Sequence, residues 1–359
     1  ERSLAIFKEI GNKQGEAEAL SDLGFIYREI EDYNQAIIFL EQSLDINREM
    51  GDRQGESTAL NRIGVIYNDA QSYKQSISFL EKSLAISQEI GNLRSKANAL
   101  GNLGIAYHSL GDFKQAVDFY QQSLIIKRKI GDRAEEGWTL SNLGRLFNDQ
   151  NEPNLGIIFL KASVEVRESI RGDISKLDSG LQKSFTDTVT DDYRLLAELL
   201  LNQGRLLEAQ QVLDLLKAQE LNEYLRGIRG FGFTLAILEP EREILERYGA
   251  ITENAITVGQ RLIELRQTAP SDRSIDQQSE ISQLVELQED INRQFREFAR
   301  SKEVIELLQK LSPALQDATV HLTSLNRLRK ELPKLNSALL TPLVLDDRLE
   351  IILTTADSP

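Results

Sequence analysis

The chain has 359 residues, of which 41% are hydrophobic, and its 42 Lys and Arg against 56 Asp and Glu give a net charge of −14. This charge repels a phosphate backbone, and no apolar run or basic amphipathic helix suits a bilayer, so we expect neither nucleic acid nor a membrane as a partner. The sequence has no Cys and only two His, which excludes disulfides, thiolate metal sites and a cysteine nucleophile within it; we expect no metal, no cofactor and a cytoplasmic location.

The first part of the chain repeats itself every 40 residues, because a segment that begins with Gly11 returns at Gly51, Gly91 and Gly131. Residues 1–6 match residues 81–86, which lie in the second half of a repeat. We therefore expect the chain to start inside a repeat whose first helix lies upstream. A period of this size is typical of a solenoid, in which each repeat buries its apolar face only by stacking on its neighbours.

Each repeat contains two apolar patterns with helical spacing. The first, in residues 19–27, is Ala-Leu-x-x-Leu-Gly-x-x-Tyr, and the second, in residues 33–44, is Tyr-x-x-Ala-x-x-Phe-Leu-x-x-Ser-Leu. The glycine in the middle of the first helix, Gly24 in the first full repeat, costs about 1 kcal/mol relative to alanine. We expect it to permit close approach of the paired helix, and the glycine after the second helix to cap that helix.

These patterns resemble the tetratricopeptide repeat over residues 1–170. The 40-residue period is longer than the common one of about 34 residues and is similar to the repeats of kinesin light chains. The resemblance implies an all-α fold: a right-handed α-solenoid made of the second helix of a cut repeat and four full repeats. The fourth repeat departs most from the pattern, since Pro153 replaces the aromatic residue and Arg145 replaces the apolar residue after Gly144.

The rest of the chain divides into four predicted regions. Residues 171–228 carry apolar residues at helical spacing and are interpreted as degenerate repeats or capping helices, followed by a Gly-rich linker at residues 229–235. The charged residues 236–333 predict a long antiparallel helical hairpin of coiled-coil character. Alternating apolar residues in the last region, 334–359, predict a short β-hairpin at the C-terminus.

The order of these parts, together with the segment Thr341-Pro-Leu-Val-Leu-Asp-Asp-Arg-Leu-Glu-Ile-Ile-Leu353, is similar to bacterial CHAT proteins, in which a caspase-like domain follows tetratricopeptide repeats. The resemblance spans residues 180–359. It implies that the β-hairpin opens a caspase-like sheet and that the chain is truncated before the catalytic part. Members of the family use a His and Cys dyad. Because this chain has no Cys, we assign no catalytic residue and expect no enzyme activity from it, while the full-length protein stays a candidate cysteine peptidase.

The tetratricopeptide resemblance places the groove of the array on the first helix of each repeat. Three of the four residues at the central groove position are apolar, whereas a repeat that clamps a peptide carboxylate needs Asn there and cations nearby. We predict a groove that takes an apolar or mixed helix or an extended peptide, with Asn amides bonding its backbone. In the alternative interpretation, the apolar residues only pack between helices. The predicted groove residues are Ser21, Phe25, Arg28, Asn61, Val65, Asn68, Asn102, Ile105, His108, Trp138, Asn142, Arg145 and Asn148.

Trp138 is the only Trp and is a candidate binding anchor, or else part of the core between repeats. His108 is interpreted as a polar lining residue, because no nucleophile can be placed beside it. The predicted function is thus a protein interaction scaffold that binds a peptide or a partner protein. The alternative is the regulatory, sensing arm of a caspase-like cysteine peptidase, with an intramolecular contact between the array and the downstream peptidase domain.

Overall fold

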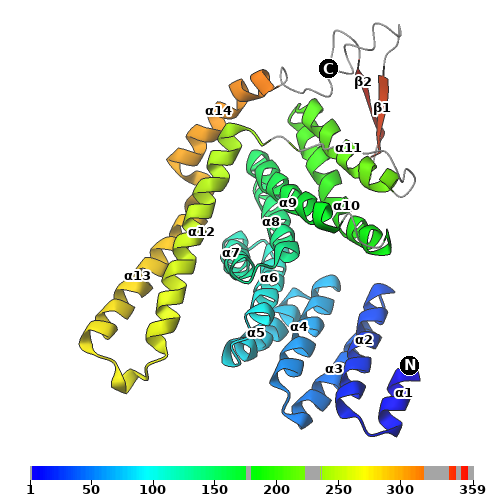
Figure 1. Cartoon of the computed structure of the whole chain (residues 1–359), viewed down its shortest axis with the longest axis vertical. Helices are drawn as coiled ribbons and strands as arrows, with labels where there is room; N and C mark the ends of the chain where they lie inside the picture. The colour runs from blue at the N-terminus through cyan, green and yellow to red at the C-terminus, as the bar shows by residue number, and fades with distance from the viewer. Residues whose placement is uncertain are drawn as a thin grey trace. The chain divides into compact units, whose positions relative to one another are not determined.

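The computed structural model describes residues 2–174, 179–222, 235, 237–318, 339–344 and 349–354. Apart from two short strands, the regular structure of these residues is helical (Figure 1). The chain falls into two compact bodies. The first body contains Glu1–Asp132 with Thr252–Arg296, and the second contains Arg133–Ile251 with Glu297–Pro359. The domain boundaries predicted from the sequence stay predictions.

Residues 2–129 of the first body form α1 and three helical hairpins, each helix packing mainly against the helices before and after it (Figure 1). We call the first helix of each repeat helix A and the second helix B. This succession confirms the predicted α-solenoid of consecutive helix pairs. The helices are α1 (Arg2–Glu9), α2 (Lys13–Glu29), α3 (Tyr33–Met50), α4 (Arg53–Asp69), α5 (Tyr73–Glu89), α6 (Leu93–Ser109) and α7 (Phe113–Lys129).

The mid-helix glycines allow helices A and B to touch. A Cβ built on Gly24 would lie 2.6 Å from Cγ of Leu40, and one on Gly104 would lie 2.5 Å from the ring of Tyr120. Real Cβ atoms do not approach other atoms so closely, so only glycine fits. This confirms the expectation that the mid-helix glycines permit close approach of the paired helix. The expected caps are confirmed as well: the glycines after each helix B, from Gly11 to Gly131, have φ between +67° and +71°.

A buried serine of every helix B donates a hydrogen bond to a carbonyl oxygen of its own helix A, 26 residues earlier in the chain. The Oγ to O distances are 2.7–2.8 Å in all four repeats. Each bond satisfies a hydroxyl that would otherwise be buried without a partner. The fourth repeat keeps this bond although its sequence departs most from the pattern. The pairs are Ser43 with Ala17, Ser83 with Ser57, Ser123 with Ala97 and Ser163 with Gly137.

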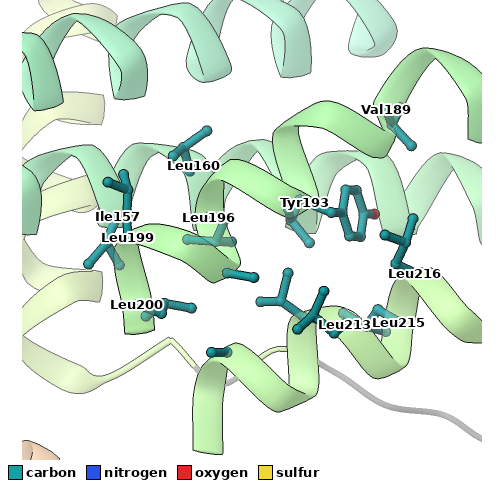
Figure 2. Packing of buried hydrophobic residues seen from close by; sticks show 14 residues of the cluster. Ile157, Leu160, Val189, Tyr193, Leu196, Leu199, Leu200, Leu213, Leu215 and Leu216 are labelled. Carbon is teal, nitrogen blue, oxygen red and sulfur yellow. The ribbon is translucent and has the colours of Figure 1, made fainter. Parts of the chain in front are cut away.

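The second body begins with the fourth repeat and continues into two further helices. A cluster of buried apolar side chains joins α9, α10 and α11, and Figure 2 shows these side chains gathered between the three helices. Within it, the ring of Tyr193 is fully buried and its hydroxyl donates to Glu168 Oε1 at 2.6 Å. The helices are α8 (Arg133–Asp149), α9 (Pro153–Ile174), α10 (Ser179–Asn202) and α11 (Leu206–Asn222).

The predicted long helical hairpin is confirmed as α12 (Glu239–Arg266) and α13 (Ile275–Glu297), with the short helix η1 (Pro270–Asp272) between them. Arg261 of α12 donates to Glu280 of α13 at 2.6 Å, which ties the two helices together. The chain continues through η2 (Phe298–Arg300) and α14 (Lys302–Ala318). Among the described helices, none combines the length and the apolar character that crossing a bilayer demands.

The predicted C-terminal β-hairpin is also confirmed. Strand β1 (Leu339–Val344) pairs with β2 (Leu349–Thr354) in antiparallel fashion, in a register that runs from Leu339 opposite Thr354 to Val344 opposite Leu349. The predicted linker at residues 229–235 lies, apart from Leu235, outside the described residues.

Candidate functional site

The predicted groove residues of the first body lie on α2, α4 and α6, and the central row is accessible to solvent. Phe25 keeps 50% of its surface exposed, and Val65 and Ile105 are partly exposed. Leu20, five residues before Phe25 on the same helix, is 1% exposed. Each helix A therefore buries one face against its partner and leaves the row of Phe25, Val65 and Ile105 on another.

Polar side chains of the same three helices hydrogen-bond one another. Nδ2 of Asn102 donates to Oδ1 of Asn61 at 3.2 Å, Nδ2 of Asn68 donates to the carbonyl oxygen of Asn102 at 3.1 Å, and Arg62 donates to Ser21 Oγ at 2.6 Å. Asn68 is only 8% exposed, and its Oδ1 has no hydrogen-bond partner among the described residues. A buried amide oxygen without a donor typically costs about 1–3 kcal/mol.

Two further predicted groove residues have different surroundings. Arg28 Nε donates to Asp69 Oδ2 at 2.5 Å, and its Nη1 lies 3.3 Å from Glu29, so this guanidinium faces two carboxylates. The ring of His108 packs near the rings of Phe113 and Tyr120, with centroids 5.8 and 6.5 Å away. The part of the chain that the structure describes holds no group of three His, Asp or Glu side chains placed to bind a metal.

The predicted groove residues of the fourth repeat lie on α8, in the second body. Asn142 donates to the carbonyl oxygen of Trp138 in its own helix, at 3.1 Å. Trp138 and Asn148 are partly exposed. Arg145 reaches Asp192 of α10, with 2.7 Å between Nη2 and Oδ1.

A buried cluster of four charged side chains in the second body was not predicted from the sequence. Lys161 of α9 pairs with Glu208 of α11 and, at 2.7 Å, with Glu241 of α12. Arg205, just before α11, donates to Glu208 at 2.8 Å and to Glu241 at 2.6 Å. Lys161 and Glu241 are fully buried. The sequence does contain a signal for this cluster. The residues at the equivalent position of the earlier repeats are Glu41, Glu81 and Gln121, so Lys161 departs from the repeat pattern.

The charged side chains of this cluster stabilise one another's ionised forms. Burial by itself raises the pKa of Glu208, but Lys161 and Arg205 outweigh it and hold that pKa below its ordinary value. Burial likewise lowers the pKa of Arg205, and Glu208 and Glu241 outweigh this effect and raise it. Two cations meet two carboxylates, so the cluster is neutral as a whole. None of the four is more than 7% exposed, and the cluster joins α9, α11 and the start of α12.

The comparisons with known proteins agree with this repeat geometry. The family model described as tetratricopeptide repeat matches residues 1–49 and 55–129. No curated protein is significantly similar to the chain. Among solved structures, BtubC (BKLC) from P. vanneervenii is 17% identical with a TM-score of 0.52, over 66% of this chain and 93% of that one. At this identity the likeness shows the fold alone.

Two other solved structures have lower TM-scores. A putative kinesin light chain from Podosopora anserina with nearly identical TPR-like repeats is 18% identical with a TM-score of 0.42, over 57% of this chain and 95% of that one. A Rap protein complexed with competence and sporulation factor is 10% identical with a TM-score of 0.46, over 80% of this chain and 76% of that one. The family-model match and the repeated helix pairs together identify residues 1–49 and 55–129 as tetratricopeptide repeats.

Proposed function

We propose that this chain is a protein interaction scaffold and that the helix A row of Phe25, Val65 and Ile105 binds a peptide or a segment of a partner protein. The observation that carries the proposal is that an accessible apolar side chain recurs at the same position of three consecutive helices A. Burying such a side chain fully contributes about 1.5–3 kcal/mol, and Phe25, half exposed, retains a good part of this for a partner.

The amide network beside the row suits a peptide backbone. Asn61 and Asn102 are partly exposed and already hold each other in place, and their remaining donors and acceptors can bond a peptide backbone. Side chains that are ordered before binding lose less conformational entropy when the partner arrives. The row therefore combines apolar contact with fixed hydrogen-bond acceptors, which together select an extended or helical peptide.

The chain's own helical hairpin contacts helix B within the first body. Arg296 of α13 lies 3.2 Å from Asp118 of α7, and Asp118 belongs to helix B of the third repeat. This contact involves none of the predicted groove residues, which lie on helices A. The helix A row is therefore left available by this contact.

A peptide-library capture experiment tests the proposal. Phe25→Asp, Val65→Asp and Ile105→Asp each place a charge in the row and should weaken capture about tenfold or more, as expected for central contacts of an interface. The matched control is Ile38→Asp, because Ile38 is 44% exposed but lies on helix B. The control should capture peptides as the parent chain does. Equal capture by all four variants, with unchanged circular dichroism, rejects the proposed row.

The second candidate function is the regulatory arm of a caspase-like cysteine peptidase. The pairing of β1 with β2 favours it, because the CHAT resemblance expects the opening strands of a caspase-like sheet there. Two strands rarely form an independent sheet in water, so they need further strands or a helix to pack on. The test is whether the natural protein continues beyond Pro359 with a strand ending in His-Gly and another ending in Cys: their presence supports this candidate, and their absence rejects it.

A further inference from the structure

Helix A begins with an ion pair in three of the four repeats. Its first residue is a cation, its fourth is a glutamate, and the two side chains form a salt bridge. The pairs are Lys13 with Glu16 at 3.4 Å, Arg53 with Glu56, and Arg133 with Glu136 at 3.7 Å. In the second repeat, Arg53 also donates to Glu89 at the end of helix B, at 2.5 Å. One guanidinium thus bridges two carboxylates, one from each helix of the repeat.

The third repeat has the opposite charges at these positions. Both carboxylate positions hold lysines, and the bridging position holds an apolar side chain. The replacements are Leu93 for Arg53, Lys96 for Glu56 and Lys129 for Glu89. A second cation that pairs with Glu56, Arg48 of the preceding helix B, has the neutral Gln88 as its equivalent. The cations that surround the glutamate in the second repeat are therefore absent around Lys96, and no anion takes their place.

Lys96 and Lys129 lie near each other without a counter-ion. Lys96 is only partly exposed, and its burial and the charge of Lys129 both lower its pKa. In the part of the chain that the structure describes, neither ammonium pairs with a carboxylate. The acid nearest to Lys129 in the sequence, Asp132, already accepts a hydrogen bond from Arg94 at 2.5 Å. Two positive charges therefore stay unbalanced where α6 begins and α7 ends.

We propose that Lys96 and Lys129 form a binding site for a phosphate monoester. In the second repeat, the guanidinium of Arg53 lies between the two equivalent side chains and contacts both, so an anion in the same place can contact both lysines. A carboxylate carries one negative charge and balances one lysine, whereas a phosphate monoester carries about −1.5 to −2 at pH 7 and balances both. Lysine, a point charge with rotatable donors, is also a common phosphate ligand.

The phosphate site is separate from the helix A row, because it includes the last turn of a helix B. Lys96 lies at the beginning of α6, whereas Ile105 of the row lies in the second half of that helix. The inference therefore goes beyond the proposed function, and either one can fail without the other. The phosphate can belong to a small free ester or to a phosphorylated side chain of a partner, since both present the same dianionic group.

Titration of the parent chain with inorganic phosphate tests the site directly. The lysine Cε atoms are isotope-labelled for NMR, sodium chloride holds the ionic strength constant, and acetate replaces phosphate in a parallel titration. Phosphate should shift the Lys96 and Lys129 signals saturably with one common Kd, and it should raise the pKa of Lys96. Acetate should bind about tenfold more weakly, because it balances only one charge. The signal of Lys82, an exposed lysine of α5, should not move.

Variants assign the binding to this pair of lysines. Lys129→Gln should weaken phosphate binding about tenfold, because one of two charged donors is lost, and the matched control Lys82→Gln should leave it unchanged. The double variant Leu93→Arg with Lys96→Glu restores the residues that the second repeat has at these positions, and it should bind no phosphate.

A library of phosphoserine peptides and their unphosphorylated twins distinguishes the two sources of phosphate. A member that binds more tightly than inorganic phosphate, and more tightly than its twin, identifies a phosphorylated partner. If no member does, the ligand is a small ester. Lys96 and Lys129 signals that phosphate does not move, or that acetate moves equally, overturn the inference and leave the helix A row untouched.

Discussion

The first three repeats and the fourth have the same packing between helices A and B but differ on the outer face of helix B. In all four, a tyrosine or phenylalanine of helix A packs against a phenylalanine of helix B, with ring centroids 5.0–5.4 Å apart. At the outer position, Glu41 and Glu81 are exposed, Gln121 is 3% exposed and Lys161 is fully buried. The packing between helices A and B is therefore determined within each repeat, whereas the burial of the outer position depends on what packs against it.

The buried charges of the fourth repeat give this comparison its sharpest test. Glu241→Gln removes one anion from the cluster and leaves the buried Lys161 and Arg205 with a single carboxylate. Breaking a buried ion pair in this way typically costs about 3–5 kcal/mol. The matched change Glu81→Gln, at the exposed equivalent of Lys161, should stay within about 0.5 kcal/mol. Urea unfolding followed by circular dichroism measures both.

If Glu241→Gln and Glu81→Gln lower the free energy of unfolding equally, our inference that the outer face of helix B distinguishes the fourth repeat is wrong. A combined Lys161→Met and Glu241→Leu variant adds a control, because replacing a buried pair by apolar side chains removes both charges together. It should recover part of the stability that Glu241→Gln loses.

The shared packing of helices A and B predicts that the same substitution destabilises different repeats. Gly64→Ala places a Cβ 2.6 Å from Cγ of Leu80, and Gly144→Ala places one 2.7 Å from Cγ of Leu160. Alanine favours a helix over glycine by about 1 kcal/mol, but overpacking costs typically 1–3 kcal/mol, so both variants should be destabilised by about 1 kcal/mol or slightly more. Thermal unfolding of the two variants checks this. A stabilised Gly64→Ala would show that helices A and B can separate without loss.

The sequence predicts the interior well because its determinants are local. The mid-helix glycines, the capping glycines after helix B and the serines of helix B recur every 40 residues, and each acts within its own helix pair. The long helical hairpin and the β-hairpin follow from equally local patterns of charge and alternation.

The contacts of the fourth repeat depend on distant residues, which is why sequence patterns miss them. The sequence pattern places Lys161 on a solvated helix face. Lys161 is instead buried, because it pairs with Glu208 and Glu241, which follow it by 47 and 80 residues. The same holds for the candidate site. Its positions on helix A follow from the repeat, but the pairing of Arg145 with Asp192, 47 residues away, does not.

The loops after helix A differ between repeats in a way that can be measured. Gln71 has φ +56°, Gly111 has φ +77° and Asn151 has φ +64°. Left-handed backbone costs an ordinary residue about 1 kcal/mol, while glycine and, to a lesser degree, asparagine adopt it readily. Gln71→Gly should therefore stabilise the chain by about 0.5–1 kcal/mol, Asn151→Gly should gain less, and Gly111→Gln should lose a similar amount. Denaturant midpoints of the three variants test this order, and a destabilised Gln71→Gly contradicts it.

The smallest expected effect concerns Asp118, on the face of α7 that meets α13. Its equivalents run from the exposed Ile38 and Ser78 to the fully buried Ile158, so the third repeat stands between the two extremes. Burial raises the pKa of Asp118, and the opposing effect of Arg296 at 3.2 Å does not restore it. The folded chain therefore binds a proton more readily at this position than the unfolded chain does.

The sign of the resulting pH dependence follows from this raised pKa. As pH rises from the unfolded to the folded pKa of Asp118, the unfolded state loses its proton first, and the native state loses stability. Asp118→Asn, which cannot ionise, should be equal to or more stable than the parent chain at neutral pH, by less than about 1 kcal/mol. This advantage should shrink as pH falls towards 4, because the parent chain then becomes protonated. Urea unfolding between pH 4 and pH 7 measures the difference. If Asp118→Asn is less stable at neutral pH and the gap closes on acidification, the ion pair with Arg296 outweighs burial, and the third repeat resembles the fourth in depending on its outer charges.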